Sequence, residues 1–203
     1  MLQLIEDWIS NLKMNRTGQP TKQSEVTMIW SIAVSIFCVG GMIGGSMVGS
    51  VADRFGRKGG LLLNNILVLI TVIFEGCAKT AKSYEMIIIG RFIVGINAGL
   101  NAGLAPMYLS EISPIHLRGA VGTVYQLVIT MSILVSQILG LEQILGTEDQ
   151  WPLLLCLTIV PAIFQVVTLP LCPESPKYLL LSRGKDMEAQ RGMSHAVDFN
   201  GVL

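Results

Sequence analysis

Charged residues are scarce in this sequence. They make up 14% of its 203 residues, whereas a soluble domain carries roughly 25%. The basic and acidic side chains cancel in number, so the chain has no surplus positive charge with which to attract nucleic acid. Apolar residues can then be buried only in lipid or in a very large core, and 22.0 kDa is small for such a core.

Groups typical of enzymes and metal sites are also missing. The sequence holds no Ser/His/Asp set and no glycine-rich phosphate loop. Its cysteines lack the spacing of metal ligands and are interpreted as packing residues; they are Cys38, Cys77, Cys156 and Cys172. Enzyme activity, a metal ion and a cofactor are therefore not expected. Several charges interrupt residues 1–35, so no cleavable signal peptide is expected either.

Long apolar runs are what the sequence has instead. Hydrophobic residues make up 51% of it, and its mean hydropathy is +0.60. A helix needs about 20 mostly apolar residues to cross a bilayer. Runs that approach this length occupy residues 27–52, 59–78, 86–108, 119–141 and 151–173. They predict an all-α integral membrane protein with about five transmembrane helices over residues 27–173.

The distribution of lysine and arginine predicts the orientation of these helices. Basic residues gather at one set of helix ends, and the other loops hold only Lys79 and Lys82. Because basic loops stay in the cytoplasm, residues 174–203 are expected to form a cytoplasmic tail and residues 1–26 an extracellular segment. Asn15 begins the sequence Asn-Arg-Thr in that segment, so it is a candidate glycosylation site.

Three motifs lie at the predicted cytoplasmic helix ends. They read G-S-V-A-D-R-F-G-R-K at residues 49–58, P-M-Y-L-S-E-I-S-P-I-H-L-R-G at 106–119 and P-E-S-P-K-Y-L-L at 173–180. Taken alone, the first could be a basic cytoplasmic loop with a glycine turn. In this order the three resemble the signatures of the major facilitator superfamily and its sugar-porter family, near the class I facilitative glucose transporters.

The resemblance runs from about residue 27 to about residue 190. It implies an incomplete N-terminal six-helix half of the major facilitator fold, without the family's first helix. It also implies facilitative transport of a hexose similar to D-glucose, by alternating access, in the cell membrane. The alternative is a truncated isoform that does not transport, is retained in the endoplasmic reticulum, and acts at most by association with a full-length transporter.

The charged residues of the motifs are the candidate gate. By resemblance, they form a cytoplasmic ion-pair network that holds the outward-open state, with arginines as bidentate donors. Its expected members are Asp53, Arg57, Glu111, Arg118 and Glu174. The alternative interpretation is that these residues only anchor helix ends among the lipid headgroups.

One helical face of residues 119–141 carries the candidate substrate contacts. Gln126, Ile129, Ile133 and Gln137 recur every three or four residues. Amides beside an apolar wall suit a neutral polyol. In the family that the chain resembles, the glutamine that corresponds to Gln126 contacts the hexose. A hydrogen bond from Gln126 to a neighbouring helix is the other interpretation.

Two charges and two glycine stripes fall within the predicted spans. Arg91 is expected to extend toward the membrane surface or to have lost a partner on the absent helix, because intramembrane charge is normally paired. Glu75 departs from the family's apolar habit and is expected to be exposed near a helix end. The stripes are expected to allow close helix packing; they are Gly41, Gly45 and Gly49, and Gly95, Gly99 and Gly103.

Overall fold

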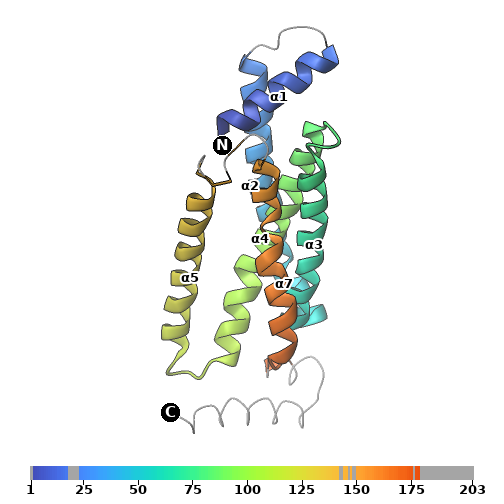
Figure 1. Cartoon of the computed structure of the whole chain (residues 1–203). Coiled ribbons are helices and arrows are strands. Elements are labelled where there is room, and N and C mark those ends of the chain that lie inside the picture. The colour runs from blue at the N-terminus through green and yellow to red at the C-terminus, as the bar shows by residue number, and fades with distance from the viewer. Residues whose placement is uncertain are drawn as a thin grey trace.

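The computed structural model describes residues 2–17, 23–141, 144–145, 147, 150–175 and 177–178, and the regular elements in these ranges are all helical. Figure 1 shows an elongated bundle with α1 across one end. The elements are α1 (Leu2–Thr17), α2 (Gln23–Phe55), α3 (Arg57–Cys77), α4 (Tyr84–Ile112), α5 (Arg118–Leu139), α6 (Trp151–Cys156), α7 (Ile159–Thr168) and the 3-10 helix η1 (Leu169–Leu171).

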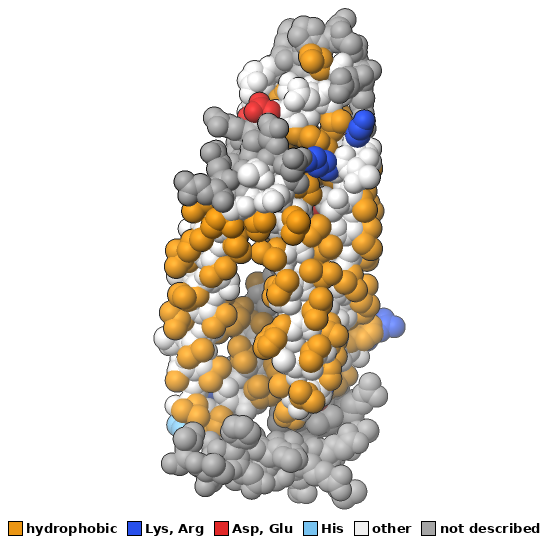
Figure 2. Space-filling view, in the orientation of Figure 1, with side chains coloured by type: hydrophobic (Ala, Val, Ile, Leu, Met, Phe, Trp, Pro, Cys, Tyr) orange, Lys and Arg blue, Asp and Glu red, His pale blue; other side chains and the backbone are white. Residues whose placement is uncertain are grey.

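Within the described residues, five helical stretches are long and apolar enough to cross a membrane. They are α2, α3, α4, α5 and the combined stretch Trp151–Leu171. Large apolar side chains cover the sides of the bundle (Figure 2), including Met42 at 76% and Phe164 at 69% exposure. Such a surface is stable in lipid rather than in water. The predicted all-α membrane protein with about five spans is confirmed.

The tightest helix contact joins α2 to α4 through glycine. A Cβ atom added to Gly44 would lie 2.2 Å from the carbonyl oxygen of Ile96, and one added to Gly99 would lie 2.3 Å from that of Gly41. No side chain fits at such distances, so the two backbones touch directly. Lipid provides no hydrophobic drive between helices, and small residues compensate for this by allowing close packing.

The glycine stripe predicted on α2 is right in part: the backbones of Gly41 and Gly45 lie beside Gly99 of α4, but other glycines present their missing side chains to that helix. Gly40 and Gly44 are the buried glycines that face α4, whereas a Cβ atom on Gly45 or Gly49 would meet nothing within 4 Å. On α4 the prediction is right, since Gly95 and Gly99 lie against the α2 backbone and a Cβ on Gly103 would meet the side chain of Val48.

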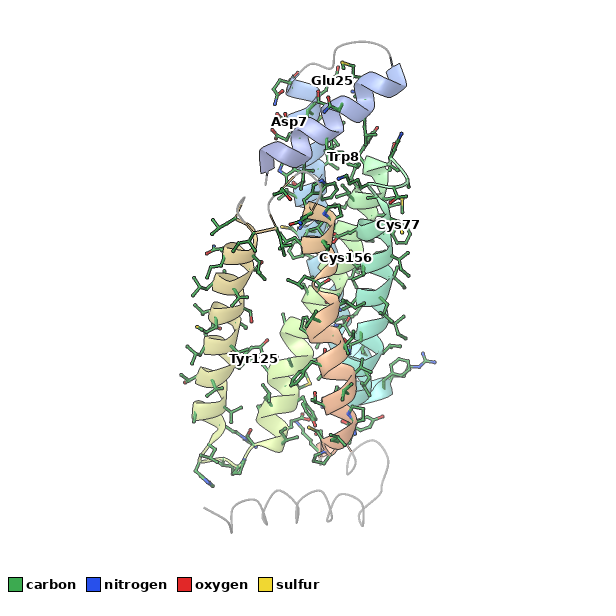
Figure 3. The ribbon with its side chains drawn as sticks, viewed as in Figure 1. Asp7, Trp8, Glu25, Cys77, Tyr125 and Cys156 are labelled. Carbon is green, nitrogen blue, oxygen red and sulfur yellow. The ribbon has the colours of Figure 1, made fainter. Side chains whose placement is uncertain are left out.

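Residues 2–17 form an amphipathic helix, which the description as an extracellular segment did not predict. Its apolar face is buried at one end of the bundle, through Ile5, Ile9 and Leu12. The ring of Trp8, labelled in Figure 3, meets that of Trp151 edge to face, with centroids 5.3 Å apart. This contact links α1 to α6, so α1 packs on the bundle. The side chain of Asn15 lies outside the described residues.

Helix α5 packs differently from the others. Figure 1 shows it beside the main bundle, and it contacts α4. All of its residues are described, and none is buried. The end of the bundle opposite α1, where the three sequence motifs meet, is called the motif end below.

Candidate functional site

The motif end begins with a glycine turn between α2 and α3. Gly56 has φ +79°, a conformation that other L-residues rarely adopt. A Cβ atom there would also lie 2.9 Å from Oε2 of Glu174 and 2.9 Å from Cε1 of Tyr178. Backbone geometry and packing therefore both require glycine. The turn lets the third motif reach the start of α3.

Glu174 caps the first turn of α3. Its Oε1 accepts hydrogen bonds from the backbone N–H of Lys58 and from that of Ser175, each at 3.0 Å. The free N–H groups at a helix start favour a negative charge. In return, Nζ of Lys58 donates to the carbonyl oxygens of Pro170 and Cys172, at 2.9 Å and 2.7 Å. The start of α3 and the end of the last span thus hold each other.

Arg57 and Glu111 form the buried centre of the motif end. Nη2 of Arg57 donates to Oε1 of Glu111 at 3.2 Å, and its Nε lies in ionic contact with Oε2 at 2.9 Å. Both side chains are about nine-tenths buried. The guanidinium also donates to the carbonyl oxygen of Ala52 at 3.2 Å. Burial protects this pair from the screening that weakens surface ion pairs.

The third motif completes the cluster through neutral side chains. The hydroxyl of Ser175, which is fully buried, donates to Oε2 of Glu111. The hydroxyl of Tyr108 donates to the carbonyl oxygen of Pro173 at 2.6 Å. The ring of Tyr178 lies 5.8 Å from the guanidinium of Arg57. The prediction of a gate counted only charges and therefore missed these residues, although each is a letter of a motif.

The five predicted gate residues do not all meet. Arg57, Glu111 and Glu174 belong to the cluster described above. The side chain of Asp53 is 80% exposed, and its Oδ1 lies 3.9 Å from Nη1 of Arg57. Arg118 is exposed at the start of α5, where its Nε donates to the carbonyl oxygen of Ser113 at 3.4 Å. Asp53 is therefore peripheral, and Arg118 lies apart from the ion pairs that the structure describes.

The predicted substrate contacts fall on the open helix α5. Ile129, Ile133 and Gln137 line a shallow groove. Gln126 is exposed and does not line this groove. The rest of the groove is made by Val128, Ser132 and Ser136. A second apolar groove lies between α4 and α5 and includes Tyr125, labelled in Figure 3. The surface of the first groove is thus almost entirely apolar, and its lining residues include Gln137 and no charge.

Arg91 has an ionic contact within this chain, which neither expectation for it included. Its Nε lies 3.8 Å from Oε1 of Glu75 on α3. Glu75 is 3% exposed, so the prediction of an exposed carboxylate is also wrong. The reason is local: a Cβ atom on Gly90 would lie 2.6 Å from Cγ of Glu75, so glycine leaves the room that the carboxylate occupies.

These spans and the motif end have the fold of solved structures of the major facilitator superfamily. The fold matches the proton:xylose symporter XylE bound to 6-bromo-6-deoxy-D-glucose with a TM-score of 0.81, over 97% of this chain and 46% of that one, at 23% identity. It matches partially occluded inward-open XylE from E. coli with a TM-score of 0.79, over 97% of this chain and 50% of that one, at 24% identity.

Sequence comparison identifies the family. The family described as "Sugar (and other) transporter" matches residues 4–200, so the chain belongs to it. Facilitated glucose transporter protein 1 of Caenorhabditis elegans is 45% identical over 98% of this chain. Facilitated glucose transporter member 5 of Equus caballus is 48% identical over 93% of it. The predicted resemblance is confirmed, and the match extends further at both ends than residues 27 to 190.

The chain is much shorter than these relatives. It covers 39% of the worm protein and 38% of the horse protein. It also spans about half of the XylE chains that share its fold. The partial N-terminal half that was predicted agrees with this coverage.

Proposed function

We propose that the chain is part of a facilitative transporter that carries a hexose similar to D-glucose by alternating access. The observation that carries this proposal is the meeting of the three sugar-porter motifs in one buried cluster at the motif end. The relatives support the substrate class, since they are facilitated glucose transporters by name. A largely apolar groove with an amide and no charge suits a neutral sugar.

The cluster would act as a gate at the cytoplasmic side of the membrane. Arg57 and Glu111 hold α3 to α4, and Glu174 and Ser175 hold the segment after η1 to these two helices. That segment therefore separates from α3 and α4 only when charged hydrogen bonds break. Each such bond stabilises by about 1.5–3 kcal/mol. A few bonds therefore suffice to shift a two-state population between outward-open and inward-open forms. Asp53 and Arg118 would join the gate only after a rearrangement.

Helix α5 would supply one wall of the sugar site. In this proposal Gln137 binds a hydroxyl group, Ile129 and Ile133 pack on the ring, and Gln126 binds from the next turn. The orientation follows from the basic residues, with the motif end and residues 174–203 in the cytoplasm and residues 1–26 outside. Asn15 would then carry a glycan, and the protein would lie in the cell membrane.

Uptake into proteoliposomes tests the proposal directly. Vesicles that contain only this chain are incubated in radiolabelled D-glucose or L-glucose, with protein-free vesicles as the control. Saturable uptake of D-glucose above L-glucose would support transport by the chain itself. Equal, unsaturable leakage of the two enantiomers would rule it out for this chain.

A second candidate is a membrane protein that does not transport alone but associates with a full-length transporter. The observation that favours it is the open face of α5, which buries no residue although it carries the proposed sugar contacts. Co-expression with the worm relative tests this. Co-purification in detergent with an altered D-glucose uptake rate supports association, and an unchanged rate with no co-purification excludes it.

A further inference from the structure

Three polar pairs join α3 to α4 inside the bundle. Apolar residues such as Leu61 and Val68 are buried between them. Each pair takes one residue from each helix, so the pairs follow the whole seam from the motif end toward α1. The pairs, called the polar ladder below, are Arg57–Glu111, Asn64–Asn97 and Glu75–Arg91.

The middle pair of the ladder is reciprocal. Nδ2 of Asn64 donates to the backbone carbonyl oxygen of Asn97, and Nδ2 of Asn97 donates to that of Asn64, each at 3.0 Å. Both residues are buried, at 2% and 7% exposure. This exchange needs the two residues to lie level with each other. A slip of one helical turn, about 5.4 Å, would break both bonds and leave buried amides without partners.

The pair nearest α1 joins an enclosed carboxylate to a partly exposed arginine. Glu75 fills the space that Gly90 leaves, and Arg91 follows Gly90 directly on α4. Cys156 of α6 closes another side, since its Sγ would lie 2.7 Å from a Cβ atom on Gly76. Among the described residues, Oε1 of Glu75 has no hydrogen-bond donor and Nε of Arg91 is its ionic contact. An ionised carboxylate in lipid needs such a counter-ion.

The sign of the charges reverses along the ladder. At the motif end α3 carries the cation and α4 the anion, whereas near α1 α3 carries the anion and α4 the cation. Antiparallel helices satisfy both pairs only in one register, because sliding one helix separates both pairs at once. We propose that Glu75 is the internal counter-ion of Arg91 and that this pair, with the rest of the polar ladder, sets the register of α3 against α4.

The α3–α4 hairpin would then move as one rigid body. Its seam is held at three levels, whereas α5 buries nothing. Conformational change would take place at the interfaces of this hairpin with neighbours other than α2, which packs on α4 through glycine. This inference concerns the fold and does not depend on the transported substrate.

A double-mutant cycle on the full 203-residue chain in detergent tests the proposal. Arg91→Gln leaves the buried carboxylate of Glu75 unpaired, and Glu75→Gln leaves the partly exposed Arg91 unpaired within a membrane span. Each is therefore expected to lower the melting temperature by about 5 °C or more. The double variant removes both charges and is expected to regain at least half of that loss. Asp7→Asn on the exposed face of α1 is the matched control, with a change below about 2 °C.

Register is measured separately by the distance between spin labels at Ile66 of α3 and Ile89 of α4, which are both exposed. The labels are attached in a background with the four native cysteines replaced by serine. Glu75→Gln is expected to broaden the distance distribution, and the double variant to narrow it again. Losses of stability that simply add in the double variant, or a distribution that Glu75→Gln leaves unchanged, would overturn the proposal. Should Glu75→Gln not fold, Arg91→Gln and the double variant carry both measurements: a higher melting temperature and a narrower distance distribution in the double variant than in Arg91→Gln support the proposal, and no recovery overturns it.

Discussion

Glu111→Gln removes the negative charge at the centre of the motif end and keeps the shape of the side chain. Arg57 then remains buried without a counter-ion, since its other carboxylate contact is exposed Asp53 at 3.9 Å. Ser175 loses a charged acceptor as well. The contact with Lys177 matters little, because that side chain is 62% exposed and lies 3.9 Å away.

The size of the effect follows from burial. Breaking a buried ion pair by removing one partner costs about 3–5 kcal/mol. The amide oxygen of glutamine still accepts one hydrogen bond, so the lower value of about 3 kcal/mol is expected. For a chain of this length that corresponds to a fall in melting temperature of about 6–12 °C. Asp53→Asn, at 80% exposure, should change it by less than about 2 °C.

The assay measures thermal unfolding of the purified chain in detergent. The quantity recorded is the fraction of the protein that still elutes as a monodisperse peak after heating. Wild type, Glu111→Gln and Asp53→Asn are heated side by side. If Glu111→Gln melted within 2 °C of Asp53→Asn, the Arg57–Glu111 pair would not be a buried stabilising contact. The gate proposed for the motif end would then have no energetic basis.

Three further predictions use the same assay. Gly44→Val forces a side chain into the α2–α4 contact and should lower the melting temperature by about 5 °C or more, whereas Gly45→Val, which points into open space, should change it by less than about 2 °C. Trp8→Ala removes the ring packed on α6 and should lower it by about 6 °C; Met14→Ala, half exposed on α1, is the control. Gly56→Ala should lower it by about 3–6 °C through backbone strain and contact with the third motif. The first two predictions would each be contradicted if the variant and its control had the same melting temperature. The third would be contradicted if Gly56→Ala left the melting temperature of the wild type unchanged.

The spans were predictable because lipid imposes a simple rule on composition. A run of about 20 apolar residues can cross a bilayer only as a helix, so the sequence predicts all five spans. The same rule says nothing of a shorter helix that packs at one end, which is why α1 was missed. Its apolar positions, Ile5, Ile9 and Leu12, recur at helical spacing and could have indicated it.

Details of the seam depend on which face of a helix meets a neighbour. Gly40 and Gly44 have the same four-residue spacing as Gly41 and Gly45. Spacing alone therefore could not show which pair would point a side chain into α4. The partner of Arg91 was missed for a similar reason. Glu75 lies near a helix end in sequence, and only the space beside Gly90 shows that its carboxylate turns inward.

The cap on α3 has a consequence for the order of biosynthesis. Glu174 lies 116 residues after Lys58, whose N–H it accepts. A ribosome therefore translates α2, α3, α4 and α5 before it makes this carboxylate. Until then the first turn of α3 lacks its anionic cap. The cap can form only after Trp151–Leu171 and the segment that follows have been made, so an early helix is completed by a much later part of the chain.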